Sequence, residues 1–177
     1  ASTMQVIARE AGYTRAVLYR HFVTRDKLLD ALVLRVALRK MAQIAGRLQG
    51  TVDPNVLVVE SLVMVATEVA QDPLLDVLSE RADDGNVADL IARSTTLSEV
   101  LAGHFETAFR DLGAGYLRAG LRPADAARFV LSIALGLLLR LIPVDDAEQV
   151  RRYLRVFVLP ALAADPPPVT PVFTPLH

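Results

Sequence analysis

The fold is constrained most strongly by the longest uncharged apolar run in the chain, from Phe129 to Leu139, because such a run must be shielded from water. The run falls well short of the roughly 20 residues that a membrane-spanning helix needs. Around it, the segment from about Ala124 to Leu141 repeats apolar residues at helical spacing and leaves almost no polar face. Such a helix must be covered on several sides. The run therefore predicts a buried helix within a larger set of helices.

The rest of the sequence also predicts an all-α fold. The chain is 53% hydrophobic but only 6% aromatic, and its apolar residues are mainly Leu, Val and Ala, of which Ala and Leu favour helix over sheet. No segment alternates apolar and polar residues as a half-buried strand does. Helical periodicity and capping residues predict further helices over Arg25–Leu48, Asn55–Ala70, Asp72–Arg81, Val87–Ala119 with an interruption near 94–97, and Asp146–Leu162.

Two short helices are predicted to meet at a tight corner around Gly12. The first begins at a Ser2-Thr3-Met4-Gln5 capping box, and glycine is the residue that most often follows the end of a helix. Thr14 then has the type of an N-cap for a second helix that contains Leu18, Tyr19 and Phe22. Two helices joined this closely cross steeply, which is the geometry of a helix-turn-helix module.

Charge is distributed unevenly along the chain. Residues 1 to 40 contain eight arginines and lysines and three acidic residues, although the whole chain has 19 basic residues, 20 acidic residues and a net charge of −1. The N-terminal end is therefore suited to a polyanion, and a solvated charged surface is the alternative explanation.

The residues around the corner also resemble a known family. The pattern is Ile7-Ala8-x-x-Ala11-Gly12-Tyr13-Thr14-x-x-x-Leu18-Tyr19-x-His21-Phe22, followed by Thr24-Arg25-Asp26-x-Leu28-Leu29. In these positions the chain resembles the TetR family of bacterial transcriptional regulators. The resemblance implies a helix-turn-helix DNA-binding domain over residues 1–42 and a helical ligand-binding and dimerisation domain over residues 43–164. The Pro-rich residues 165–177 are predicted to form an extended tail.

In such a module the second helix enters the major groove and presents its first residues to the bases. Arg15 is the candidate for reading a guanine, and the resemblance implies phosphate contacts by Tyr19 and His21. A helix N-terminus or an ammonium near one favours phosphate. The predicted DNA-binding residues are Thr3, Tyr13, Thr14, Arg15, Tyr19, His21 and Lys27. The alternatives are that the threonines are simple caps, that Tyr19 is a core aromatic and that Arg15 and Lys27 are solvated charges.

The chain departs from the family pattern in two places. Family members have another helix, and often a basic arm, before the position of Ala1, so we expect that the first helix of the module is missing from this sequence. Tyr13 also replaces the small apolar residue that usually follows the glycine, which affects the geometry of the base contacts.

The last two helices, about Ala124 to Leu141 and Asp146 to Leu162, predict a homodimer. A two-fold dimer places two recognition helices about 34 to 36 Å apart, one turn of DNA, and so fits a palindromic operator. The alternative is that both helices belong to the core of a monomer. The residues predicted at the dimer interface are Phe129, Ile133, Leu137, Tyr153, Leu154 and Phe157.

Residues on two helices in the middle of the chain are predicted to line a ligand site. Apolar side chains with a few polar groups among them are typical of small-molecule cavities, although core packing explains the apolar ones equally well. The candidates are Met64, Thr67, Leu101, His104, Phe105 and Phe109. The function predicted is a repressor that a small apolar effector releases from its operator. The alternative is a DNA-binding protein whose helical domain binds a protein partner and has no inducer.

Enzyme chemistry has little support in the sequence. The chain has no cysteine, only three histidines, and no Gly-rich phosphate loop or nucleophile elbow. We therefore expect no enzyme activity, no cofactor and no metal site. With no secretory signal and no membrane-length apolar run, we expect a cytoplasmic protein without a membrane partner.

Overall fold

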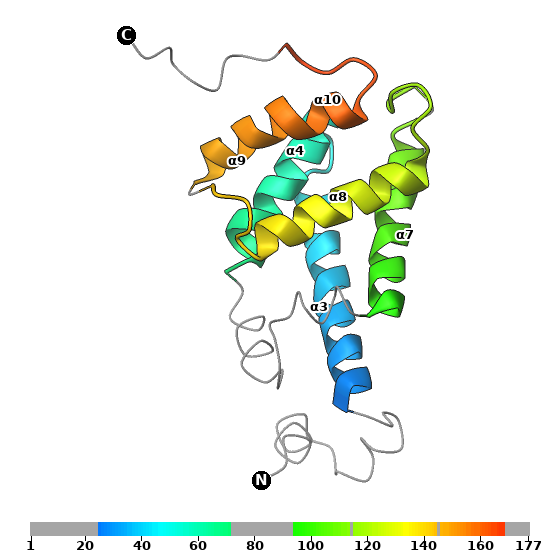
Figure 1. The fold of residues 1–177 in the computed structure, drawn as a ribbon, viewed down its shortest axis with the longest axis vertical. Helices are drawn as coiled ribbons and strands as arrows, with labels where there is room; N and C mark the ends of the chain where they lie inside the picture. Colours follow the sequence, from blue (N-terminus) through cyan, green and yellow to red (C-terminus); the bar gives the residue numbers. More distant parts are fainter. Residues whose placement is uncertain (1–24, 72–93, 114, 145, 169–177) are drawn as a thin grey trace.

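The computed structural model describes residues 25–71, 94–113, 115–144 and 146–168, and in these ranges it is built from helices (Figure 1). Within the described ranges the only β-type pairing is an isolated bridge between Leu117 and Ala163. The elements are α3 (Arg25–Arg47), α4 (Pro54–Met64), a π-helical turn (Val65–Val69), α7 (Thr95–Asp111), α8 (Pro123–Leu138), α9 (Ala147–Tyr153), a second π-helical turn (Leu154–Val158) and α10 (Leu159–Leu162). The predicted all-α fold is confirmed.

Short polar side chains start three of these helices. Asp53 accepts a hydrogen bond from the backbone N–H of Asn55 at 2.8 Å, and Pro54 occupies the first turn of α4. Ser94 accepts from the N–H of Leu97 at the start of α7, and Asp146 accepts from the N–H of Gln149 at the start of α9. Each cap satisfies an N–H that has no partner inside its own helix.

The C-terminal helical segment runs from Ala147 to Leu162 and passes through Pro160. The sequence predicts that Pro160 kinks or ends this helix, and only Ala161 and Leu162 follow it in helical conformation. A π-helical turn, Leu154–Val158, precedes the proline closely. Proline has no N–H to donate to the preceding turn, and a widened turn is a common way for a helix to accommodate such a break.

The main core lies where α4, α8 and the α9–α10 segment meet. Ala126, Ala127 and Leu154 are fully buried there, and α7 contributes Phe109. The small Ala126 and Ala127 allow neighbouring helices to approach α8 closely. The prediction that this apolar helix is covered on several sides is therefore confirmed.

A second, smaller core holds α3 against α7 and α8. It consists of Val33 and Val36 from α3, Leu97 and Leu101 from α7, and Leu131 from α8. Figure 1 shows the Arg25 end of α3 pointing away from α8, α9 and α10. α3 therefore joins the helical domain to the residues that precede it, and the predicted domain boundary at residue 42 falls inside this helix.

One predicted helix is too long. The sequence predicts a helix from Val87 to Ala119 with an interruption near 94–97. α7 begins at Thr95, in agreement with that interruption, but it ends at Asp111, eight residues before Ala119. Gly113 ends the helix because its φ of 93° lies in the left-handed region. Residues 87–93 and the predicted helix from Asp72 to Arg81 lie outside the described ranges. Among the helices that are described, none combines the length and apolarity needed to cross a bilayer.

Candidate functional site

Most of the predicted DNA-binding residues fall on the part of the chain that the structure does not describe. These are Thr3, Tyr13, Thr14, Arg15, Tyr19 and His21. Lys27 is described, and it is exposed in the first turn of α3.

An apolar cavity of about 310 Å³ lies between α3, α4, α7 and α8 and is partly open to solvent. Three helices each contribute one face with the same spacing, in which residues at i, i+3, i+4 and i+7 line up. These faces are Met41, Ile44 and Ala45 from α3 with Leu48 just after it; Val58, Ser61 and Leu62 from α4 with Val65 in the turn after it; and Phe105, Ala108 and Phe109 from α7 with Leu112 just after it. Leu57, His104 and Val130 complete the lining.

Only two polar side chains, Ser61 and His104, are among the lining residues. Nδ1 of His104 lies 3.0 Å from the carbonyl oxygen of Val100, one turn earlier on α7. A carbonyl oxygen can only accept, so this bond requires the proton on Nδ1 and leaves Nε2 as an acceptor in the neutral ring. The cavity is therefore almost wholly apolar, with polar groups from two different helices.

Three of the predicted ligand-site residues line the cavity: His104, Phe105 and Phe109. The other three do not. Leu101 is buried in the smaller core, and Met64 lines a separate cavity of about 280 Å³ beside Arg47 and Glu68. The hydroxyl of Thr67 donates to the carbonyl oxygen of Val63 at 2.9 Å and so is satisfied within its own helix. The wall from α3 was missed, although the spacing of Met41, Ile44, Ala45 and Leu48 is a readable signal.

The two halves of α3 have different surroundings. Towards its N-terminus, Val33 and Val36 are 1% and 6% exposed in the smaller core. The hydroxyl of Ser94 also donates to Oδ2 of Asp30 at 3.1 Å, which ties α3 to the residue that caps α7. Towards its C-terminus, α3 borders the cavity instead of a packed core. At the C-terminal end of α3, Nη1 of Arg47 donates to Oε1 of Glu68 in the π-helical turn after α4 at 2.6 Å. Both ends of α3 are thus held by polar contacts, and the stretch from Met41 to Ala45 faces the cavity.

An ion pair links the cavity helix α4 to α9. Nε and Nη2 of Arg151 donate to the two carboxylate oxygens of Glu60 at 2.7 and 2.9 Å. The hydrogen bond from Arg151 holds the pKa of Glu60 below its ordinary value. The side chains are about one quarter to one third exposed, at 25% for Glu60 and 30% for Arg151, so the pair is only partly screened by solvent.

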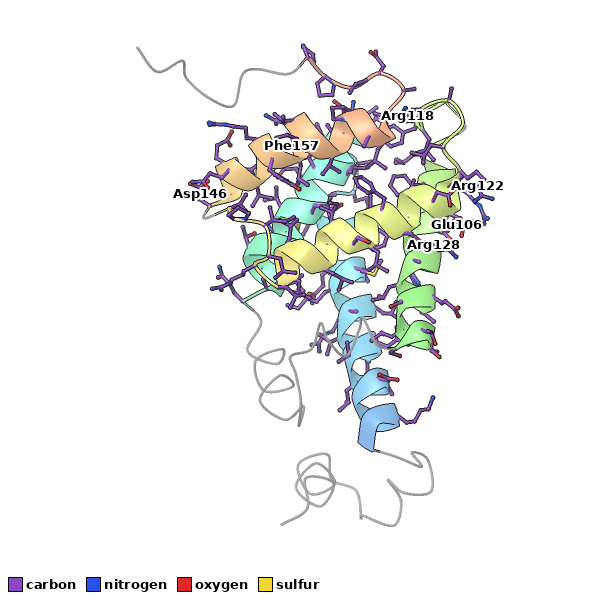
Figure 2. The ribbon with its side chains drawn as sticks, in the orientation of Figure 1. Glu106, Arg118, Arg122, Arg128, Asp146 and Phe157 are labelled. Atoms are coloured by element: carbon purple, nitrogen blue, oxygen red, sulfur yellow. The ribbon has the colours of Figure 1, made fainter. Side chains whose placement is uncertain are left out.

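The predicted dimer residues divide into two groups. Phe129 and Phe157 are exposed at 36% and 56%, and Ile133 and Tyr153 are partly exposed. Phe157 lies along the helical segment that runs from α9 to α10 (Figure 2), and its ring is 5.3 Å from that of Tyr153. Leu137 and Leu154 are only 3% and 0% exposed. Both pack in the protomer's own core, so they offer a partner almost no surface.

Comparison with known proteins identifies the N-terminal segment. Residues 1–32 match the sequence model of a family described as bacterial regulatory proteins, tetR family. The N-terminal segment therefore matches the DNA-binding module of TetR-family regulators. The resemblance predicted from the residues around Gly12 is confirmed.

The fold agrees with that of a solved repressor structure. The chain superimposes on NalD from Pseudomonas aeruginosa, the secondary repressor of the MexAB-OprM multidrug efflux pump, with a TM-score of 0.56 and 24% sequence identity. The alignment covers 93% of this chain and 88% of NalD. A search of curated proteins found no match. In the part of the chain that the structure describes, no group of three or more histidine or acidic side chains is arranged to hold a metal ion.

Proposed function

We propose that this TetR-family regulator is a homodimeric repressor that leaves a palindromic operator when a small, mainly apolar ligand enters the cavity between α3, α4, α7 and α8. The observation that supports the proposal is the position of α3. This helix begins within the segment that matches the family model, and its C-terminal half forms one wall of the cavity. A ligand in the cavity therefore touches the helix that carries the DNA-binding segment.

Contacts on α3 suggest how the two sites are coupled. A ligand that presses on Ile44 and Leu48 acts on one end of α3, while Val33 and Val36 hold the helix against α7 and α8. A small rotation about that contact changes the direction of the Arg25 end and hence the separation of two DNA-binding segments in a dimer. A coupling free energy of about 1 to 3 kcal/mol between ligand and operator is enough to change operator occupancy.

The operator contact is tested with Arg15→Ala, using selection of bound DNA from a genomic library at two salt concentrations. We expect a palindromic preferred site for the wild type. We expect the variant to lose discrimination at one base pair by about 1 to 3 kcal/mol, because a bidentate contact to guanine specifies a base. The matched control is Arg39→Ala, which removes an exposed cation from the middle of α3 and should leave the preferred sequence unchanged.

Two outcomes count against this assignment. Equal weakening on all sequences would make Arg15 a phosphate contact, because phosphate contacts carry no sequence information. A preferred site without two-fold symmetry would contradict the homodimer.

A further inference from the structure

The lining of the cavity limits the charge of the ligand. The residues that line it include no aspartate, glutamate, lysine or arginine, and thirteen of them are apolar. A carboxylate or ammonium group brought into such a site loses its hydration without gaining an opposite charge. The volume of about 310 Å³ lies at the lower end of small-molecule sites. These features favour a neutral ligand of one or two rings.

The walls of the cavity favour an aromatic ligand. Phe105 and Phe109 are four residues apart on α7 and therefore neighbours on one face of the helix. Met41 of α3 lines the same cavity, and a thioether sulfur makes favourable contacts with aromatic rings. A flat aromatic ligand would contact both kinds of side chain.

His104 decides which polar group the ligand should carry. Its Nδ1 donates to the carbonyl oxygen of Val100 at 3.0 Å, so Nε2 of the neutral ring can only accept. The hydroxyl of Ser61 can both donate and accept a hydrogen bond, so it does not distinguish a ligand that carries a donor from one that carries an acceptor. Among the lining residues, His104 is therefore the one whose free ring nitrogen suits a ligand that carries a hydrogen-bond donor.

We infer that the cavity binds a small neutral phenol, with its aromatic ring among Met41, Phe105 and Phe109 and its hydroxyl donating to Nε2 of His104. The inference rests on the proposed function and names the class of its ligand. A phenolic O–H suits the site because it is a hydrogen-bond donor on a flat apolar body. An ether or ketone of the same shape offers only another acceptor to His104.

Calorimetric titration of the purified protein with three naphthalenes tests the inference. 2-Naphthol carries the donor, 2-methoxynaphthalene keeps the ring and the oxygen but has no donor, and 2-naphthoate carries a charge. We expect 2-naphthol to bind at least tenfold more tightly than 2-methoxynaphthalene, and 2-naphthoate to bind most weakly.

The substitution His104→Leu should reduce the ratio of the affinities for 2-naphthol and 2-methoxynaphthalene from about ten to nearly one. 2-Methoxynaphthalene should bind the variant about as well as it binds the wild type. His104 is exposed, so the substitution leaves the buried cores intact. The matched control is Thr107→Ala on the same helix. Thr107 does not line the cavity, and its hydroxyl donates to the carbonyl oxygen of Gly103 at 3.0 Å. This variant should keep the preference for 2-naphthol.

Equal affinity of the wild type for the two neutral naphthalenes would overturn the inference, and so would a tenfold preference that survives His104→Leu. In both cases binding of the naphthalenes still supports an apolar ligand site, so the proposed function stands. Absence of binding by all three compounds would overturn the inference as well. The proposed function fails separately, when no small molecule that fills the cavity releases the operator.

Discussion

At the scale of single residues, the pair between Glu60 and Arg151 is the most informative polar contact. The hydrogen bond from Arg151 places the pKa of Glu60 below 4.5, so the pair stabilises the fold above that value and its contribution is lost as the pH falls through the pKa of the folded state. Glu60→Gln should lower the free energy of unfolding by about 1 kcal/mol at pH 7. Urea denaturation at pH 7 and below pH 4 measures this, and the loss should shrink at the lower pH.

Glu148→Gln is the matched control, because Glu148 also faces Arg151. Its carboxylate lies 3.6 Å from Nη1 of Arg151, and the side chain is 65% exposed. An exposed pair of this kind contributes little, so the variant should differ from the wild type by less than about 0.5 kcal/mol. Equal losses of unfolding free energy in the two variants would show that the two-bond geometry between Glu60 and Arg151 adds no stability.

Tyr116 gives a second prediction at this scale, in the alkaline range. Its ring stacks on Phe109 with centroids 6.3 Å apart, and its buried hydroxyl has no hydrogen-bond partner among the described residues. Burial, and to a smaller extent the negative charge of Asp53, raises the pKa of Tyr116 to about 12 from 10.0. Its contribution to stability is therefore present below pH 10 and lost as the pH rises from 10 towards 12.

Tyr116→Phe keeps the stacked ring and removes the hydroxyl. At pH 7 the variant should be as stable as the wild type or slightly more stable, because an unpaired buried hydroxyl costs free energy. Between pH 10 and 12 the wild type should lose stability that the variant retains, as measured by thermal unfolding at several pH values. Parallel pH profiles for the two proteins would contradict this assignment.

At the scale of an element, the end of α7 depends on one backbone conformation. Gly113 has a φ of 93°, and a Cβ built there meets no atom within 4 Å, so the backbone alone decides the effect of a substitution. Gly113→Ala should destabilise the protein by about 1 kcal/mol, because an L side chain strains the left-handed conformation. Chemical denaturation measures the difference.

Gly103→Ala on the same helix is the control. Gly103 lies inside α7 and also has open space at the position of a Cβ. Here alanine should stabilise the helix by roughly 0.5 to 1 kcal/mol, since glycine is the more flexible residue in the unfolded chain. A loss of stability in both variants would mean that crowding, and not the backbone, controls these positions.

At the scale of the whole molecule, the exposed apolar side chains of α8 and α9–α10 fit the proposed dimer. Phe157→Arg should weaken self-association by at least tenfold, because it places a charge among apolar groups at the interface. Phe157 is 56% exposed in the protomer, so thermal unfolding of the dilute protein should change little. Val52→Arg is the control, since Val52 is 91% exposed before α4. Sedimentation equilibrium checks both, and a Phe157 variant that associates like the wild type would rule out this surface.

The sequence predicted the elements whose signals are local. Asp146 marks a helix start, and the apolar spacing from Ala126 to Leu137 required a covered helix. The residues around Gly12 predicted the family. The end of α7 was missed because Gly113 is compatible both with a weakened helix and with a helix terminus, and only the backbone conformation distinguishes them.

The sequence by itself determined that this is a helical protein whose N-terminal segment matches the TetR-family model, because caps, spacing and the corner motif act between residues close together in the chain. Only the tertiary structure decided which apolar faces meet. Leu137 and Leu154 turned inward, Phe129 and Phe157 outward, and α3 became a wall of the cavity beside His104. Burial is a competition among all the helices for the same space, so no single helix's sequence can specify it.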